Sequence, residues 1–247
     1  MKRMIALIVA LLLLLTLGSG CGGKKDAEGQ TEPAGASEDE ALFAPLIEKY
    51  REAFSNFSYD SYDLDINYLL VDYYYDGGRD LVGYTVYDID RDGTPELMIG
   101  EKDEQNPEQM RLNGLAGIYT LQNGVPKWLI GSDYEFAGIS VLAEGKILEK
   151  RTYWGKQIES ASVNIVYGIK AGELSAEKTY FGVGEYDETG SLDKVTLSYS
   201  VDGALPTDSD GEVLLKEMQP ISAETYKAAM ASFDGAALEL PITLFFE

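Results

Sequence analysis

The chain has 247 residues, of which 42 are acidic and 20 are basic, giving a formal net charge of −22. This charge excludes nucleic acid as an expected partner, because an acidic surface repels phosphate backbones. There is no histidine, and Cys21 is the single cysteine. These absences exclude Ser-His-Asp and Cys-His nucleophilic sites, histidine-ligated zinc and histidine general bases. Carboxylate pairs, a Ser-Lys pair, tyrosine or a bound metal remain available for catalysis.

Residues 1–20 have the pattern of a bacterial lipoprotein signal peptide. A basic start precedes an apolar run from Ile5 to Leu17, which is too short to span a bilayer comfortably. Small residues then lead to Cys21 as in a lipobox, although Gly18 stands where a bulky aliphatic residue is usual. We expect cleavage before Cys21, acylation of this cysteine, and attachment to the extracytoplasmic face of the cell membrane. The alternative is an ordinary secreted protein with a leftover thiol.

The predicted mature chain divides into a tether and one domain. Cleavage removes two basic residues and no acidic one, so its formal charge becomes −24. Residues 21–40 contain no aromatic side chain and no apolar period, which predicts a disordered acidic tether extending from the lipidated Cys21. The remaining residues, 41–247, number about 205 and suit a single folded domain.

Hydrophobic periodicity predicts the elements of this domain. Apolar residues at helical spacing predict a helix over Ala41–Phe57, with Ser37 or Asp39 as its cap and Pro45 near the start of its regular part. A short helix is expected around Ile66 to Tyr73. The period then becomes two, and strands are predicted over 81–88, 97–100, 115–121, 125–130, 136–142, 146–154, 161–170, 174–181 and 194–201.

The end of the chain returns to helical spacing. A helix is predicted from Ser222 through Phe233 and is expected to stop at Asp234-Gly235. A final strand or extended segment is expected over Leu238–Phe246. This order predicts an α+β fold, mainly an antiparallel β meander with the N-terminal and the C-terminal helix packed on one face.

The loop from Asp88 to Glu96, with the sequence DIDRDGTPE, carries acidic residues at alternate positions between two predicted strands. Ca²⁺ takes six to eight oxygen ligands, which alternate side chains of a turning loop can supply, while Gly93 permits the sharp turn. The predicted ligands are the side chains of Asp88, Asp90 and Asp92, the carbonyl of Thr94, and Glu96 directly or through a water. We therefore expect a structural Ca²⁺ ion, bound with the millimolar-range affinity of extracellular modules.

This loop departs from an EF-hand, because Ile99 occupies the position of the bidentate glutamate and the flanks are strands. It resembles instead the strand-loop-strand calcium sites of FG-GAP repeats in integrin-type propellers, although a single copy does not support a propeller. The alternative is a solvated acidic turn whose aspartates cap one another's backbone. Two further acidic segments, Asp208–Glu212 and Asp187–Asp193, lack part of the ligand series and are interpreted as turns.

The mature chain also resembles a loosely defined group of uncharacterised surface lipoproteins from Clostridia-type Gram-positive bacteria. The matching segments are APLIEKYR (44–51), YDIDRDGTPEL (87–97) and GIYT (117–120), of which only the acidic motif is specific. The resemblance implies surface attachment and a calcium-type loop, and it implies no activity.

Three functions follow as hypotheses. The first is a non-enzymatic binding or scaffold lipoprotein, in which Ca²⁺ stabilises a β surface that binds a glycan or an envelope protein. The 17 tyrosines, with Trp128 and Trp154, offer aromatic contact area for such a ligand. The second is a polysaccharide or cell-wall hydrolase that uses two carboxylates, whose geometry no linear spacing reveals. The third is a Ca²⁺-dependent accessory to a transporter or secretion system.

Overall fold

The structure is a computed structural model that describes residues 37–56, 66–75, 80–112, 114–132, 137–156, 158, 160–186 and 192–246. These residues belong to one compact unit, Ala36–Glu247. The predicted signal peptide, the lipidated Cys21, nearly all of the predicted tether and Asp187 lie outside the described residues. Within the described part of the chain, no helix combines the length and the apolar character needed to cross a membrane.

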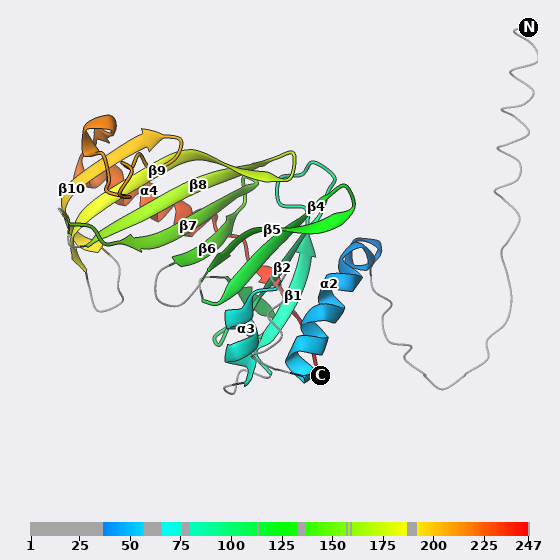
Figure 1. The fold of residues 1–247 in the computed structure, drawn as a ribbon. Helices are drawn as coiled ribbons and strands as arrows, with labels where there is room; N and C mark the ends of the chain where they lie inside the picture. The colour runs from blue at the N-terminus through cyan, green and yellow to red at the C-terminus, as the bar shows by residue number, and fades with distance from the viewer. Residues whose placement is uncertain are drawn as a thin grey trace, which may run out of the picture. The chain divides into compact units, whose positions relative to one another are not determined.

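The described residues form helices and two antiparallel sheets (Figure 1). The helices are α2 (Glu38–Ser55), α3 (Tyr68–Tyr73), the 3-10 helix η2 (Leu215–Glu217) and α4 (Ala223–Ala236). The first sheet contains β1 (Val82–Tyr87), β2 (Glu96–Lys102), β3 (Gln109–Arg111), β4 (Ala116–Gln122), β5 (Val125–Ser132), β12 (Leu240–Pro241) and β13 (Thr243–Leu244). The second contains β6 (Ala137–Leu142), β7 (Lys146–Tyr153), β8 (Ala161–Lys170), β9 (Glu173–Tyr186), β10 (Leu192–Asp202) and β11 (Gln219–Pro220).

The α+β prediction is confirmed, and the structure adds a division that the sequence pattern did not indicate. The strands form a seven-stranded and a six-stranded sheet, in place of one continuous meander. The N-terminal helix α2 shares a core with the first sheet, whereas the C-terminal helix α4 packs on the second. The two helices therefore cover different sheets, because alternation identifies the buried face of a strand without identifying what covers it.

Helix α2 begins three residues before the predicted domain boundary at Ala41. Ser37 is its N-cap, and the Ser37 Oγ accepts a hydrogen bond from the Glu40 N–H at 3.1 Å, as the capping prediction required. This early start leaves Pro45 inside the helix and not in its first turn, a correction to the prediction. The buried face of α2 consists of Phe43, Leu46, Ile47, Tyr50 and Phe54.

The first sheet is buried on both sides around β2. β2 pairs with β1 along one edge and with β4 and β3 in succession along the other. Leu97 and Ile99 of β2 face the core shared with α2 and α3, and Met98 faces the core shared with the second sheet. Successive strand residues point to opposite faces of a sheet. Glu96, the first residue of β2, therefore lies on the same face as Met98.

The second sheet carries α4 on one face, with a buried contact at Tyr226. The Asn164 Nδ2 of β8 donates a hydrogen bond to the Tyr226 hydroxyl at 3.0 Å, and a Cβ added at Gly182 would lie 2.7 Å from the tyrosine ring. Ser222 caps α4 as predicted, since its Oγ accepts from the Thr225 N–H. The expected stop at Asp234-Gly235 is wrong, because the helix continues to Ala236.

Candidate metal centre and the adjoining pocket

The loop between β1 and β2 turns around its own carboxylates. The backbone adopts positive φ angles at Arg91 (61°) and Gly93 (91°). The Asp92 N–H donates to Oδ1 of Asp88 and to Oδ1 of Asp90, each at 3.2 Å, and the Gly93 N–H donates to Oδ2 of Asp88 at 3.0 Å. These Asx-type bonds hold the two aspartates on the inner side of the loop.

Three carboxylates converge at this loop. Asp88, Asp90 and Glu96 each offer an oxygen, and these oxygens lie within 4.8 Å of one another. Among the described residues this is the one group of three or more acidic side chains with such spacing. Asp92, also a predicted ligand, lies outside the group, and its Oδ1 accepts the Thr94 N–H at 2.7 Å. The group could therefore hold a metal ion.

Glu96 is the buried member of this group, with 1% of its surface exposed. Its Oε2 accepts the Ile89 N–H at 2.9 Å, and its Oε1 accepts the Thr120 hydroxyl at 2.9 Å. Burial raises the pKa of Glu96 to about 7, the two hydrogen bonds oppose this rise, and the charges of Asp90 and Asp88 add to it. Burial likewise raises the pKa of Asp90. A cation among these oxygens would favour the charged form of both carboxylates, against the burial and the repulsion that raise their pKa values.

A turn from the second sheet supports the loop from outside. The Arg91 Nη2 donates to the carbonyl of Ala143 at 3.1 Å, in the turn between β6 and β7. In the same turn Gly145 has a φ of 77°, and a Cβ added there would lie 2.9 Å from the carbonyl oxygen of Ile89. Glycine is required at this position both by the backbone angle and by the close approach to the loop. The site is thus built where the two sheets meet.

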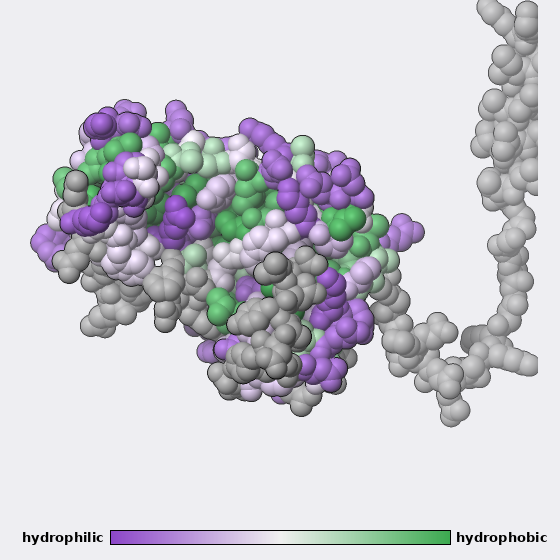
Figure 2. Space-filling model, viewed as in Figure 1, coloured by the Kyte–Doolittle hydropathy of each residue, from purple (hydrophilic) through white to green (hydrophobic). Residues whose placement is uncertain are grey.

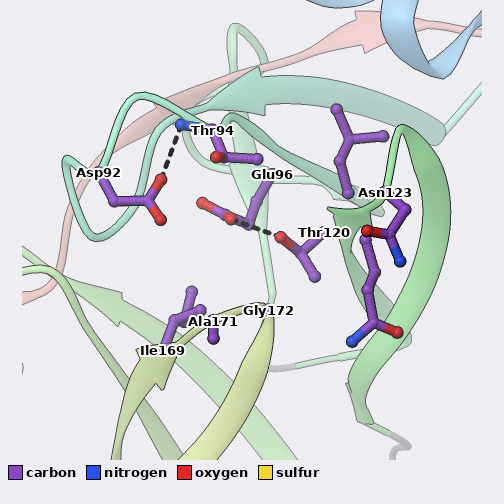
Figure 3. Close-up of a pocket in the computed structure, with 10 residues that line it drawn as sticks. Asp92, Thr94, Glu96, Thr120, Asn123, Ile169, Ala171 and Gly172 are labelled. Carbon is purple, nitrogen blue, oxygen red and sulfur yellow. Dashed lines mark hydrogen bonds between the residues drawn. The ribbon is translucent and has the colours of Figure 1, made fainter.

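A polar pocket of about 340 Å³ adjoins the loop (Figure 3). Its walls come from the loop and the start of β2, from the end of β4 with the following turn, and from the turn between β8 and β9. The residues that line it are Asp92, Thr94, Glu96, Thr120, Leu121, Gln122, Asn123, Ile169, Ala171 and Gly172. Figure 3 shows Glu96 and Thr120 directed toward each other inside these walls. Glu96 therefore belongs both to the carboxylate group and to the pocket.

The surface near the loop is hydrophilic. In Figure 2, hydrophilic residues cover the part of the visible face where Figure 1 places the loop between β1 and β2. Asp92 is exposed, while Asp88 and Asp90 are partly exposed and Glu96 is buried. The carboxylate group thus extends from solvent to the interior, which gives an ion access from water and at least one ligand held by protein contacts.

The second acidic turn that the structure describes, Asp208–Glu212, does not assemble a comparable group. Oδ1 of Asp208 accepts the N–H groups of Asp210 and Glu212, each at 2.9 Å. The carboxylate of Glu212 accepts the Lys156 N–H at 3.1 Å and a hydrogen bond from Tyr153 at 3.3 Å. These bonds give the segment the role of a turn, as the sequence interpretation proposed.

Comparisons of this chain with models of protein families, with curated proteins and with solved structures find no match. The chemistry of the site is therefore inferred from the residues that form it. All three converging side chains supply hard carboxylate oxygens, which bind Ca²⁺, Mg²⁺ or Mn²⁺ in preference to softer metals. The sequence analysis did not identify Thr120, because a threonine within an apolar strand gives no signal that it contacts Glu96.

Proposed function

We propose that the protein is a Ca²⁺-stabilised binding or scaffold module, anchored by a lipidated Cys21 on the extracytoplasmic face of the membrane and lacking enzymatic activity. Its ligand is a glycan or an envelope protein. The observation that carries the proposal is the convergence of the Asp88, Asp90 and Glu96 carboxylates. Asp88 and Asp90 lie in the β1–β2 loop and Glu96 begins β2, so one ion would tie the loop to the strand, which suits a structural role for the metal.

The choice of Ca²⁺ rests on the geometry of the donors. Ca²⁺ accepts irregular sets of six to eight oxygens, whereas Mg²⁺ demands near-ideal octahedral geometry. The group spans 4.8 Å and combines a fixed buried carboxylate, Glu96, with two partly exposed aspartates. Carbonyl and water oxygens, including the predicted Thr94 carbonyl, would complete the coordination.

A hydrolase acting through two carboxylates has less support. Away from the loop, the buried carboxylates among the described residues are Glu101 and Glu149. Glu101 forms an ion pair with Arg111, and Glu149 accepts the Tyr167 hydroxyl at 2.8 Å. Each of them has a structural partner, and no described pocket contains either one with a second acid.

Calorimetric titration with Ca²⁺ tests the proposal. The variant Asp90→Asn removes one charge from the group while keeping an oxygen that can accept the Asp92 N–H. We expect the wild type to bind one Ca²⁺ with a Kd on the order of 0.1–1 mM, and the variant to bind at least tenfold more weakly. Asp210→Asn is the matched control, because it removes the same charge from the other acidic turn. Absence of binding in the wild type, or equal loss in both variants, would contradict the proposal.

The anchor makes a separate prediction. Replacing Cys21 with serine removes the thiol that receives the lipid, and a stable anchor needs more than one acyl chain. We expect the wild type in the membrane fraction of the producing bacterium and Cys21→Ser in the medium or the soluble fraction. Immunoblots of the fractions measure the distribution, and an unchanged membrane share for Cys21→Ser would refute the anchor while leaving the calcium site untouched.

A further inference from the structure

The pocket beside the metal centre has the dimensions and position of a small-ligand site. It lies between turns contributed by both sheets, and its volume of about 340 Å³ is near the lower end of the range for small-molecule sites. We propose that this pocket binds a neutral, hydroxyl-rich ligand, a single sugar residue of a glycan. This inference rests on the proposed function, because it assigns a ligand class and a location to the same binding module.

The charge of the lining excludes anions. Two carboxylates, Asp92 and Glu96, line the pocket, and the lining contains no lysine or arginine. With one Ca²⁺ bound, the three converging carboxylates and Asp92 still leave a net charge of −2 beside the pocket, which repels an anionic ligand in a partly enclosed space where charges are weakly screened. Phosphates, carboxylates and acidic sugars are therefore unsuitable.

The polar groups of the lining suit hydroxyls better than amines. Gln122 and Asn123 are exposed, and no other described residue forms a hydrogen bond with either side chain. Each amide offers donors and an acceptor, as a sugar hydroxyl does, whereas an ammonium group offers donors alone and would leave the amide donors unused. Leu121 and Ile169 add apolar atoms that can contact the C–H groups of a sugar ring.

The turn at Ala171 places an unusual residue for its backbone conformation at the pocket. Ala171-Gly172, between β8 and β9, has φ angles of 53° and 72°, and Asn123-Gly124, between β4 and β5, has nearly the same angles, 55° and 76°. Two-residue hairpin turns with two positive φ angles favour asparagine, aspartate or glycine at the first position. Ala171 departs from this preference at a residue that lines the pocket, and such departures concentrate at functional sites.

A charge series of sugars tests the ligand class. The full-length protein in calcium buffer is titrated with glucose, galactose, mannose and N-acetylglucosamine, and with glucosamine and glucuronate as cationic and anionic counterparts. Ligand-observed NMR and calorimetry measure binding. We expect at least one neutral sugar to bind at least tenfold more tightly than glucuronate. No binding by any neutral sugar, tighter binding of glucosamine than of every neutral sugar, or preferred binding of glucuronate would overturn the proposal.

Two substitutions at one position test the location. Ala171→Asn and Ala171→Gly both suit the turn, but asparagine adds volume inside the pocket and glycine removes it. We expect Ala171→Asn to weaken sugar binding at least tenfold and Ala171→Gly to change it less than threefold. Equal affinities in the two variants would overturn the location.

Calcium binding, measured in the same samples, separates this inference from the proposed function. Both variants are expected to keep the calcium affinity of the wild type, since Ala171 is not one of the converging carboxylates. Absence of sugar binding in the wild type, with calcium binding intact, refutes the pocket proposal alone. Absence of calcium binding in the wild type refutes the proposed metal site, while the sugar series still decides the ligand of the pocket.

Discussion

Replacing Glu96 with glutamine is expected to stabilise the calcium-free protein at pH 8 by about 2 kcal/mol and to abolish calcium binding. The pKa of Glu96 is about 7 in the folded protein against an ordinary value of 4.5, a difference that corresponds to about 3 kcal/mol. Above pH 7 the native carboxylate is charged in a buried position, where a neutral amide avoids this cost. Glutamine can still accept the Ile89 N–H and donate to the Thr120 hydroxyl.

The sign of the pH dependence follows from the raised pKa. Between pH 4.5 and about 7 the folded protein holds a proton on Glu96 that the unfolded chain has released, so the Glu96 contribution favours folding at low pH and declines as pH rises. The free energy of unfolding of the calcium-free wild type should therefore fall across this interval relative to that of Glu96→Gln. Urea denaturation in chelator at several pH values measures it. A Glu96→Gln variant that is less stable than the wild type at pH 8 would contradict the prediction.

Breaking the ion pair between Arg111 and Glu101 is expected to destabilise the protein by about 3 kcal/mol. Glu101 is 1% exposed, its Oε2 accepts from the Arg111 Nη2, and its Oε1 accepts the Leu115 N–H at 3.2 Å. The variant Arg111→Met removes the guanidinium and leaves a buried carboxylate with less compensation. Chemical denaturation at pH 7 measures the loss.

Two controls accompany this measurement. Lys194 pairs with Glu185 at 2.8 Å, but their side chains are 66% and 70% exposed, so Lys194→Met should cost less than about 0.5 kcal/mol. The double variant Arg111→Met, Glu101→Leu should recover much of the stability that Arg111→Met loses, because it removes the uncompensated charge. A loss below about 1 kcal/mol for Arg111→Met alone would show that the pair is not important for the fold.

Much of the fold was predictable because its signals are local. Period-two alternation predicted β4 and β8 closely, and Ser37 and Ser222 cap the helices as expected. The short strands β3 and β11 were missed, since two or three residues cannot show a period. The division into two sheets depends on long-range packing, which alternation within one strand does not encode.

The site was predictable in part. Alternate acidic residues identified the loop, and the structure brings Asp88, Asp90 and Glu96 together. The burial of Glu96 was not apparent, because an acidic residue after a proline is typical of an exposed turn. The available signal was its position directly before the apolar run that begins at Leu97. The pocket was not predictable, because its walls come from three segments that are distant in sequence.

The most direct test of the metal centre is a crystal structure of the protein with calcium, in which the anomalous signal locates the ion. The proposal predicts one calcium peak at about 2.4 Å from carboxylate oxygens of Asp88, Asp90 and Glu96. A map without a peak at this position, with the two aspartates turned to solvent and Glu96 bonded only to Ile89 and Thr120, would contradict it.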